Sequence, residues 1–540
     1  MLRQSFLGTP DELREAARID GAGEYRAFAQ VMLPLVKPAI AATATVQFLD
    51  AWNSYLDPLV FISNWKKWTI PLALNQFVGS EVTQYNLTKY SDLTPEIIEL
   101  SKICCKNSLI DPSNYDKYDV KRGLRDSNGK GVLTGLTEIS EVNSVIEDEN
   151  GNRTPIPGEL FYRGYSIEDL VNGFIHDKHY GFEEVSYLLL MGDLPNQEQF
   201  EEFNQLLGYY RTLPDTFVRD IIMKAPSRNI MNALSKEVLT LYSYDEKAED
   251  TSVPNVLRQC IQLIALLPVL AVYSYQAFNY FHNKQSLFIH SPQPHLSTAE
   301  NILYMLRPDC QYTKLEAKLL DMALVLHAEH GGGNNSTFTT HVVTSSGTDT
   351  YAAIAAALCS LKGPKHGGAN IKVVKMFNHI KKHVTDYNDK EQIRNYLIKI
   401  LNKEAFDKSG LIYGMGHAIY TISDPRARVF KGFVKSLSEE KGRQAEYQLY
   451  NNVEEIAAEL IMQRRKTDKK ISANVDFYSG FVYSMLDLPT KLFTPLFAIA
   501  RVSGWSAHRL EELVNPSKII RPAYQNVHDR QNYVPMDERD

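Results

Sequence analysis

Three short segments between residues 363 and 476 decide how this sequence is interpreted: GPKHGGAN (residues 363–370), YGMGHA (residues 413–418) and NVD (residues 474–476). His366 lies between Gly-Pro-Lys and Gly-Gly, which predicts a tight turn. His417 closes a Gly-x-Gly segment, whose backbone can approach a ligand closely. Asp476 adds a carboxylate. Two imidazoles and one carboxylate form a proton-transfer site if the fold brings them together.

These segments resemble the citrate synthase family. The catalytic positions of that family are a His in a G-P-x-H-G-x-A-N turn, a His in a G-x-G-H turn and an Asp in an N-V-D segment. They fall here on His366, His417 and Asp476. The family's order continues with Asp424-Pro425-Arg426, Phe497, Arg501 and Arg521-Pro522. Several motifs in the right order predict a citrate synthase region that covers residues 88–540.

The resemblance implies a division of labour in the reaction. Asp476 would take a methyl proton from acetyl-CoA. Neutral His366 would donate a hydrogen bond to the thioester oxygen as it becomes enolate-like, and such stabilisation is usually the largest catalytic effect. His417 would polarise the ketone of oxaloacetate and supply its proton. Hydrolysis would then release citrate and CoA, the first step of the tricarboxylic acid cycle. No cofactor is expected, because acetyl-CoA is a substrate.

The resemblance also implies two sets of binding residues. Arginine suits a dicarboxylate, because its planar fork binds carboxylates bidentately and keeps its charge. Oxaloacetate and citrate would be bound by His330, Arg426, Phe497, Arg501 and Arg521. In the family the last of these arginines enters from the other subunit, so we expect a homodimer. CoA would be cradled by Leu411, Ile412, Tyr413, Gly414, Met415 and Gly416.

His327 and His330 raise the question of a metal ion, because two histidines three residues apart can face one side of a helix. Spacing supplies no third ligand, and the HExxH order is missing. We therefore predict no metal site. Glu329 stands where the family often has Asp, and the glycine run Gly331–Gly333 is longer than in the commonest forms of the family.

Composition limits the class of protein. A chain of 540 residues predicts two or more domains. The 44% hydrophobic and 23% charged fractions are typical of a globular protein, and a net charge of −6 gives no reason to expect nucleic acid as a partner. Five cysteines, an odd number, indicate free thiols in a reducing compartment, here the cytoplasm. The partly polar start of the chain does not predict a signal peptide.

Residues 1–79 differ from the remainder. EAARIDG (residues 15–21) is followed after nine residues by VMLP (residues 31–34). This pattern resembles the EAA loop of permease subunits from binding-protein-dependent sugar transporters, a cytoplasmic helix pair that docks on the ATPase subunit. The resemblance covers only the tail of a permease. We therefore interpret residues 1–79 as a helical permease fragment of an ABC transporter, joined through a polar linker at residues 80–87.

Two apolar stretches need testing as membrane spans. Residues 261–273 are apolar but short, and Pro268 interrupts them, so we expect a buried helix. Residues 38–62 are longer but contain Asp50 and Asp57, which makes them a weak span at best. Membrane association is therefore expected only through residues 1–79.

Helical periodicity dominates the remainder of the sequence. Apolar residues recur near the 3.6-residue period from Phe182 to Leu190, Gly192-Asp193-Leu194-Pro195 stops that helix, and Asn196 begins another. A small β excursion is expected around residues 137–139 and 159–165. The pattern predicts an all-α protein. The resemblance adds a large domain (88–370), a smaller hinged domain (371–470) and a return to the large domain with a C-terminal arm (471–540).

Two other functions stay open. A 2-methylcitrate synthase would use propionyl-CoA, and one extra methylene changes binding by only ~1–3 kcal/mol. A membrane-associated transport component would be defined by residues 1–79. That second alternative requires several membrane spans, whereas this sequence offers one weak candidate.

Overall fold

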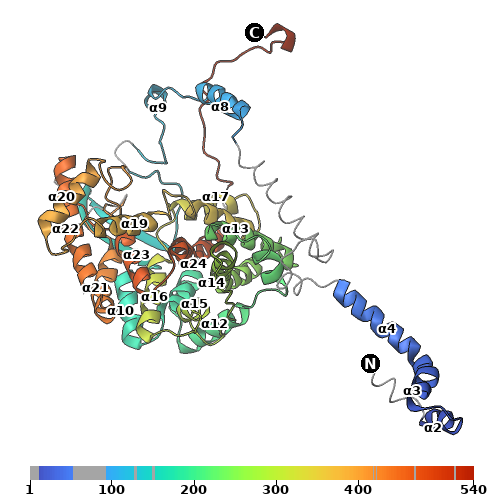
Figure 1. Cartoon of the computed structure of the whole chain (residues 1–540). Coiled ribbons are helices and arrows are strands. Elements are labelled where there is room, and N and C mark those ends of the chain that lie inside the picture. Colours follow the sequence, from blue (N-terminus) through green and yellow to red (C-terminus); the bar gives the residue numbers. More distant parts are fainter. Residues whose placement is uncertain are drawn as a thin grey trace. The chain divides into compact units, whose positions relative to one another are not determined.

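The structure is a computed structural model (Figure 1). It describes residues 11–52, 93–126, 130–148, 153–416, 419–420, 422–466, 470–515 and 518–539. The chain divides into two compact units. One is Leu133–Tyr524, and the other combines Met1–Val132 with Gln525–Asp540.

The unit Leu133–Tyr524 is built almost entirely from helices, which confirms the predicted all-α class. Its α-helices are α10 (Ile167–Asp177), α11 (Gly181–Met191), α12 (Gln197–Tyr210), α13 (Ile230–Leu241), α14 (Val253–Asn283), α15 (Thr298–Leu306), α16 (Lys314–His327), α17 (Asn335–Thr344), α18 (Thr350–Leu361), α19 (Ala369–Lys381), α20 (Lys390–Leu401), α21 (Pro425–Glu440), α22 (Gln444–Arg465), α23 (Val475–Met485) and α24 (Phe493–Val514). Short helical turns are η4 (Val218–Ile222), η5 (Tyr242–Tyr244) and η6 (Thr490–Leu492).

Local sequence signals set the helix ends. α11 ends at Gly192, whose φ of 99° lies in the left-handed region that glycine tolerates best. α12 begins after Asn196, whose side chain accepts a hydrogen bond from the Gln199 N–H, while the Gln199 side chain accepts one from the Asn196 N–H. This reciprocal capping box satisfies two backbone donors at the helix start. Both predicted boundaries are confirmed.

Helix α14 forms the centre of the core. Its middle, from Leu263 to Tyr273, is buried, and it packs against α24, as the two neighbouring labels in Figure 1 show. Among the described residues, α14 is the one unbroken helix that is long and apolar enough to cross a membrane. However, 83% of its most apolar stretch is buried inside the protein. The predicted buried helix is confirmed. The helix continues past Pro268.

A small antiparallel sheet lies beside the helices, in the order β1 (Ser140–Glu147), β2 (Arg153–Tyr162) and β3 (Tyr165–Ser166). It confirms the predicted β excursion, although β1 begins later than residues 137–139. Tyr162 ends β2, and its hydroxyl donates to the carbonyl of Val325 (3.1 Å) or Glu329 (3.0 Å). The sheet thereby fixes the C-terminal end of α16, where the residues of the site begin.

Helices α19 to α22 pack together with α23, and their buried residues belong to the same hydrophobic core as the rest of the unit. Phe377 of α19 stacks on Tyr450 of α22, with ring centroids 3.5 Å apart. Ion pairs join α20 to α22, with Lys390 2.7 Å from Glu455 and Arg394 2.6 Å from Glu459. α21 and α19 both pack on α23. The division into domains at residues 370 and 470 stays a prediction.

The other unit contains α2 (Asp11–Ile19), α3 (Glu24–Ala27), η1 (Phe28–Met32), α4 (Leu33–Trp52), α8 (Pro95–Asn107), α9 (Ser113–Lys117) and η7 (Met536–Glu538). The predicted helical character of the N-terminal fragment is confirmed. Two of its segments, Glu24–Val31 and Leu33–Thr45, together have the length and composition of a span bent by 46°. The linker at residues 80–87 and the second half of the stretch 38–62 lie outside the described residues.

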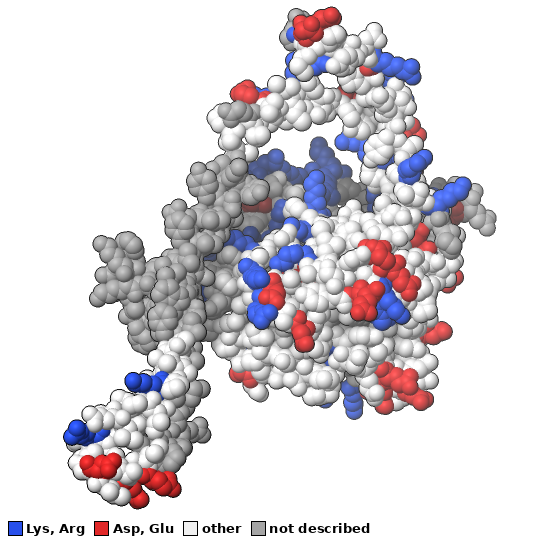
Figure 2. All heavy atoms as spheres, turned by 90° about the vertical axis from the view of Figure 1, so that its right-hand side faces the viewer, with Lys and Arg blue, Asp and Glu red and all other residues white. Residues whose placement is uncertain are grey.

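Charged side chains of both signs occur over the face shown in Figure 2, where Lys and Arg are interspersed with Asp and Glu. That nucleic acid is not a partner stays a prediction from the net charge of the sequence.

Candidate active site

The His366 turn is confirmed. It follows α18 and precedes α19, and its backbone is closed by two hydrogen bonds. The N–H of His366 donates to the Gly363 carbonyl (2.9 Å), and the N–H of Gly367 donates to the Leu361 carbonyl (3.0 Å). A Cβ on Gly367 would lie 2.5 Å from that same Leu361 oxygen, so a larger residue does not fit. The turn therefore holds the imidazole in one place.

The His366 ring is held by a polar side chain that the sequence did not point to. Its Nε2 lies 3.0 Å from the Oγ of buried Ser336, which also accepts a hydrogen bond from Trp505 Nε1 (3.2 Å) and lies 3.0 Å from Asn334 Oδ1. Burial, and next the charge of Arg501, lower the pKa of His366 to about 4. The imidazole is therefore neutral at physiological pH. The available signal for Ser336 was its place at the start of a helix after a glycine run.

Arg501 of α24 has a buried guanidinium whose two terminal nitrogens make no hydrogen bond among the described residues. The side chain is fully buried, and its Nε donates to the carbonyl of His327 (2.7 Å). Neither Nη1 nor Nη2 has a hydrogen-bond partner among the described residues. Burial lowers the pKa of Arg501 to about 10, so the group stays charged. A buried cation with two free donors fits a carboxylate, which can accept both bonds at once.

Arg426 is buried as well, but it is paired. Its Nε and Nη2 donate to the two oxygens of Asp424, at 3.0 and 2.8 Å. Burial lowers the pKa of Arg426, but the charge and hydrogen bonds of Asp424, with Tyr420 and Tyr162, together outweigh burial and raise it. Asp424 also accepts from the N–H of Val475 (3.1 Å). This carboxylate therefore connects the start of α21 to the start of α23, a role that sequence reasoning missed.

Asp476 lies in the first turn of α23. Its N–H donates to Asn474 Oδ1 (3.0 Å), so Asn474 is the helix cap and Asp476 is free for another role. A helix N-terminus normally favours a charged carboxylate. Here burial dominates and raises the pKa of Asp476 to about 6, while Arg426 lowers it and Asp424 raises it further. A base with this pKa can take and release a proton near neutral pH.

The glycine segment before His417 is tied to the segment before Asp476. The Gly416 N–H donates to the Ser472 carbonyl (2.8 Å), and the Asn474 N–H donates to the Gly414 carbonyl (2.9 Å). Asn474 Nδ2 donates to the Gly416 carbonyl (2.9 Å). Both glycines have φ above +80°, a conformation that other residues rarely adopt. His417 itself lies outside the described residues.

Phe497 lies between two of the predicted residues, His366 and Arg501, and their neighbour His327. Its ring centroid lies 4.8 Å from that of His327 and 6.3 Å from that of His366, and the Arg501 guanidinium lies 4.7 Å from it. His327 is buried, bonded through Nδ1 to the Ala323 carbonyl (2.8 Å), and burial lowers its pKa to about 3. His330 is also buried, 5.5 Å from the ring of Tyr420. The Phe497 ring thus contacts residues from α16, from the His366 turn and from α24.

Electrostatic influence joins the two halves of the site. After the effect of burial, the charge of Arg426 lowers the pKa of Asp476, of His327 and of Arg501. Charges buried in protein act over several ångströms because water screens them little. Arg426 therefore lies within electrostatic reach of the residues around Phe497 and of Asp476.

Two sets of predicted residues do not join this centre within one chain. Arg521 is exposed beyond α24, where the neighbouring Ile520 N–H donates to Ser345 Oγ (3.1 Å). In the predicted CoA segment, Leu411 is exposed, and the Tyr413 hydroxyl donates to Asp407 Oδ2 (2.6 Å). The roles of all these residues stay predictions.

Comparison with protein families gives two matches. Residues 127–523 match the model of the citrate synthase C-terminal domain. Residues 1–84 match the model of the inner membrane component of binding-protein-dependent transport systems. The first match lies inside the region 88–540 predicted from the motifs, and the second agrees with the predicted permease fragment.

Similar individual proteins point the same way. A citrate synthase from Synechocystis is 36% identical over 75% of this chain and 93% of its own length. A 2-methylcitrate synthase from Corynebacterium glutamicum is 32% identical over 78% of this chain and 98% of its own length. Among solved structures, the ternary complex of the Thermoplasma acidophilum citrate synthase with carboxymethyl coenzyme A and oxaloacetate superposes with a TM-score of 0.63. Its sequence identity is 26%, and the superposition covers 78% of this chain and 99% of that one.

Proposed function

This chain belongs to the citrate synthase family, and from that premise we propose how its residues condense acetyl-CoA with oxaloacetate and water to give citrate and CoA. The observation that carries the proposal is a pair of opposite pKa shifts caused by burial. The pKa of Asp476 is raised to about 6, and that of His366 is lowered to about 4. When the surroundings of two titratable groups shift their pKa values in opposite directions, one group is assigned as the base and the other as the neutral hydrogen-bond donor.

Enolisation of acetyl-CoA is the first step. Asp476 removes the methyl proton, and the neutral ring of His366 donates a hydrogen bond to the thioester oxygen as negative charge develops on it. The Oγ of Ser336 lies 3.0 Å from His366 Nε2 and carries one proton. When that proton is donated to His366 Nε2, the ring proton stays on Nδ1, which is then the donor to the thioester oxygen. When it is donated to Asn334 Oδ1 (3.0 Å), Ser336 accepts from His366 Nε2–H instead.

Oxaloacetate binds to the arginines. Arg501 offers two free nitrogens in a buried setting, which suits one carboxylate. Arg426 and His330 complete the chain's own binding set, and Phe497 packs against the bound acid. Arg521 enters from a second copy in a homodimer, which is consistent with its exposure in one chain. His417 polarises the ketone and supplies the proton, and the citryl thioester is then hydrolysed.

Closure of residues 371–470 over the site excludes water from the enolate. The glycine segment of residues 411–416 then cradles CoA. The stacked aromatic rings that join α19, α22 and α23 support a group of helices that moves as one piece. Small-angle scattering tests the closure, because the radius of gyration should fall when oxaloacetate and a CoA analogue are added together. An unchanged radius would count against a hinge.

The reaction proceeds with acetyl-CoA as a substrate and without a resident cofactor. The cytoplasm supplies both substrates in the proposed cellular setting, and any membrane association comes through residues 1–79. Propionyl-CoA is the competing acyl donor, because 2-methylcitrate synthases occur among the similar proteins. One methylene separates the two acyl groups, which corresponds to ~1–3 kcal/mol of discrimination.

The test is oxaloacetate-dependent release of CoA thiol from the purified full chain, with acetyl-CoA and propionyl-CoA compared as donors. We expect release with acetyl-CoA at the higher kcat/KM. A higher kcat/KM with propionyl-CoA would assign the chain to 2-methylcitrate synthesis instead. Absence of release with both donors would overturn the proposed site.

A further inference from the structure

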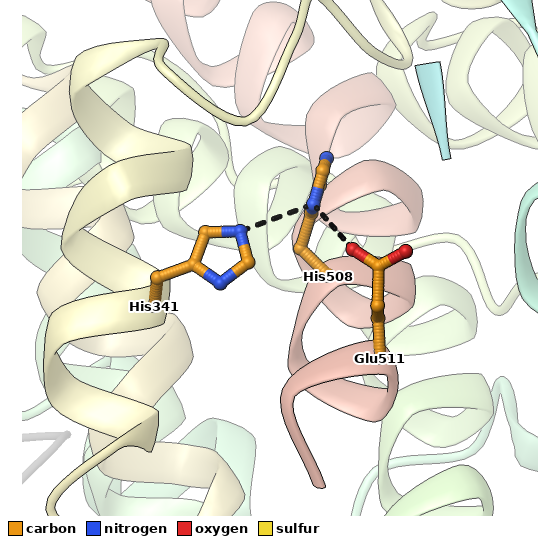
Figure 3. Close-up of side chains that lie close together, drawn as sticks. All are labelled: His341, His508 and Glu511. Carbon is orange, nitrogen blue, oxygen red and sulfur yellow. Dashed lines mark hydrogen bonds and ion pairs between the residues drawn. The ribbon is translucent and has the colours of Figure 1, made fainter. Parts of the chain in front are cut away.

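A second group of histidines and carboxylates lies between α17 and α24, outside the residues assigned to the reaction. His341 of α17 faces His508 and Glu511 of α24, which point toward it from adjacent turns of one helix (Figure 3). Their ligand atoms all lie within 4.8 Å of one another. His341 Nε2 is 3.2 Å from His508 Nδ1, and that nitrogen is 3.6 Å from Glu511 Oε2.

Each imidazole has a carboxylate at its far nitrogen. His341 Nδ1 lies 2.9 Å from Glu512 Oε2, and His508 Nε2 lies 3.2 Å from Glu329 Oε1. The Glu512 carboxylate holds the ring proton of His341 on Nδ1 and leaves a lone pair on Nε2. Burial lowers the pKa of His508, but Glu329 and Glu511 together raise it to about 9, so a metal ion displaces the proton on its Nδ1 when it binds. Histidines that bind metal ions almost always have such a partner on the other nitrogen.

Glu511 supplies the third atom. Its Oε1 accepts from the Glu138 N–H (2.7 Å), which fixes the side chain, whereas its Oε2 has no hydrogen-bond partner among the described residues. A buried acceptor oxygen without a donor is costly unless a ligand is bound to it. Among the described residues, this oxygen has an ion pair with His508 Nδ1 at 3.6 Å, which is longer than a hydrogen bond, so it stays available as a ligand.

The spacing of the three atoms agrees with a tetrahedral ion. Two ligands that are each about 2.0–2.1 Å from zinc in tetrahedral geometry lie roughly 3.3 Å apart. The separations of 3.2 and 3.6 Å are close to that value. His508 is fully buried, while His341 and Glu511 have side chains 14% and 12% exposed, so the fourth position can be reached from solvent.

We propose that His341, His508 and Glu511 form a binding site for zinc or a similar transition-metal ion, with water as the fourth ligand. Two imidazole nitrogens and one carboxylate oxygen are ligands that suit zinc. Magnesium and calcium prefer ligand sets made of oxygen atoms alone. The helices already pack on each other, and the ion joins α17 to α24. The site is independent of the proposed reaction mechanism.

The ion stabilises structure near the active site and takes no part in the reaction itself. A Cβ on Gly332 would lie 3.6 Å from His508 and 3.7 Å from His341, so the glycine run covers the site. That run leads to Ser336, which holds His366. Metal binding therefore stabilises the loop that positions the catalytic histidine, and its main effect is on thermal stability.

The test uses the full chain after treatment with a chelator and its removal. Zinc chloride is titrated by calorimetry, and cobalt chloride is titrated while the visible absorption of tetrahedral Co²⁺ is followed. We expect one zinc per chain and a rise in Tm of several degrees. The variants His341→Gln and Glu511→Gln should each lose both effects. Glu512→Gln keeps all three ligands and loses only an orienting carboxylate, so it should bind about 10–100-fold more weakly.

A matched control is His383→Gln. His379 of α19 and His383, which follows the end of that helix, form another close histidine pair, with ring centroids 4.5 Å apart, and could bind zinc weakly on the surface. The control should keep the full stoichiometry and the Tm shift. Zinc binding that survives in His341→Gln but disappears in His383→Gln would overturn the proposal. Absence of binding by the unmodified chain would overturn it as well.

Discussion

Two helices of this chain, α14 and α4, are both apolar but have opposite surroundings. Each is long, and each contains a proline inside the helix, Pro268 in α14 and Pro38 in α4. α14 is packed against α24 and is buried along its middle. In the described part of α4, only Val36 is fully buried, and Leu35 is 53% exposed.

The difference shows that context, rather than composition, separates the two parts of the chain. Residues 133–524 bury their apolar surface in a core of their own, which supports a catalytic site with shifted pKa values. The N-terminal segment buries little of its apolar surface among the described residues. Substitutions in the first part should therefore change activity and stability, and matched substitutions in the second should not.

The largest contrast concerns turnover. Asp476→Asn keeps the size of the side chain but removes the base, so we expect turnover to fall by about 10²–10⁴-fold. Binding of oxaloacetate should persist, because the arginines are unchanged. The matched variant Asp20→Asn in the N-terminal segment should leave turnover as it was. Steady-state kinetics and calorimetry with oxaloacetate give both readings. Equal loss of binding and turnover in Asp476→Asn would mean that the residue has a structural role instead.

The next contrast concerns stability. Leu267 of α14 is fully buried, and Leu267→Ala should lower the free energy of unfolding by about 2–5 kcal/mol because it leaves a cavity. Leu35→Ala in α4 removes an exposed side chain and should change it by less than about 0.5 kcal/mol. Denaturant unfolding, followed by loss of activity and by fluorescence, measures both. A similar loss for both variants would mean that α4 is part of the same cooperative core.

A smaller effect is the dependence on pH. Asp476 must be ionised to act, so kcat/KM should fall as the pH drops below about 6, the pKa of Asp476. His366 stays neutral down to about pH 4 and should not limit this range. An acid limb that lies well away from pH 6 would contradict the assignment.

The same shift predicts a gain in stability when the base is removed. The pKa of Asp476 is about 6 in the folded protein, whereas its ordinary value, which applies to the unfolded chain, is 3.8. The folded state therefore binds the proton more tightly. The resulting contribution to stability is full below pH 3.8 and is lost as the pH rises through 6. At pH 7, Asp476→Asn should be more stable than the unmodified protein by up to about 3 kcal/mol. The gain should vanish below pH 4, as thermal unfolding at both pH values would show.

Much of the fold and part of the site could be predicted from sequence. Periodic apolar residues and the Asn196 cap indicate helices because those signals are local. Segment motifs in family order located His366, Arg426, Asp476 and Arg501. The contact of Ser336 with His366 could not be predicted, because it joins residues of different helices. The convergence of His341 and His508 depends on the packing of α17 on α24, and no spacing rule encodes it.

The most direct test of the account compares oxaloacetate-dependent CoA release by the full chain and by residues 93–540, with acetyl-CoA as donor. Catalysis is assigned to the part of the chain after residue 92, so we predict release by both proteins with kcat/KM equal within about twofold. Release by the full chain alone would contradict the account, since it would make the N-terminal segment part of the enzyme. Absence of release by both proteins would refute the assignment of His366 and Asp476.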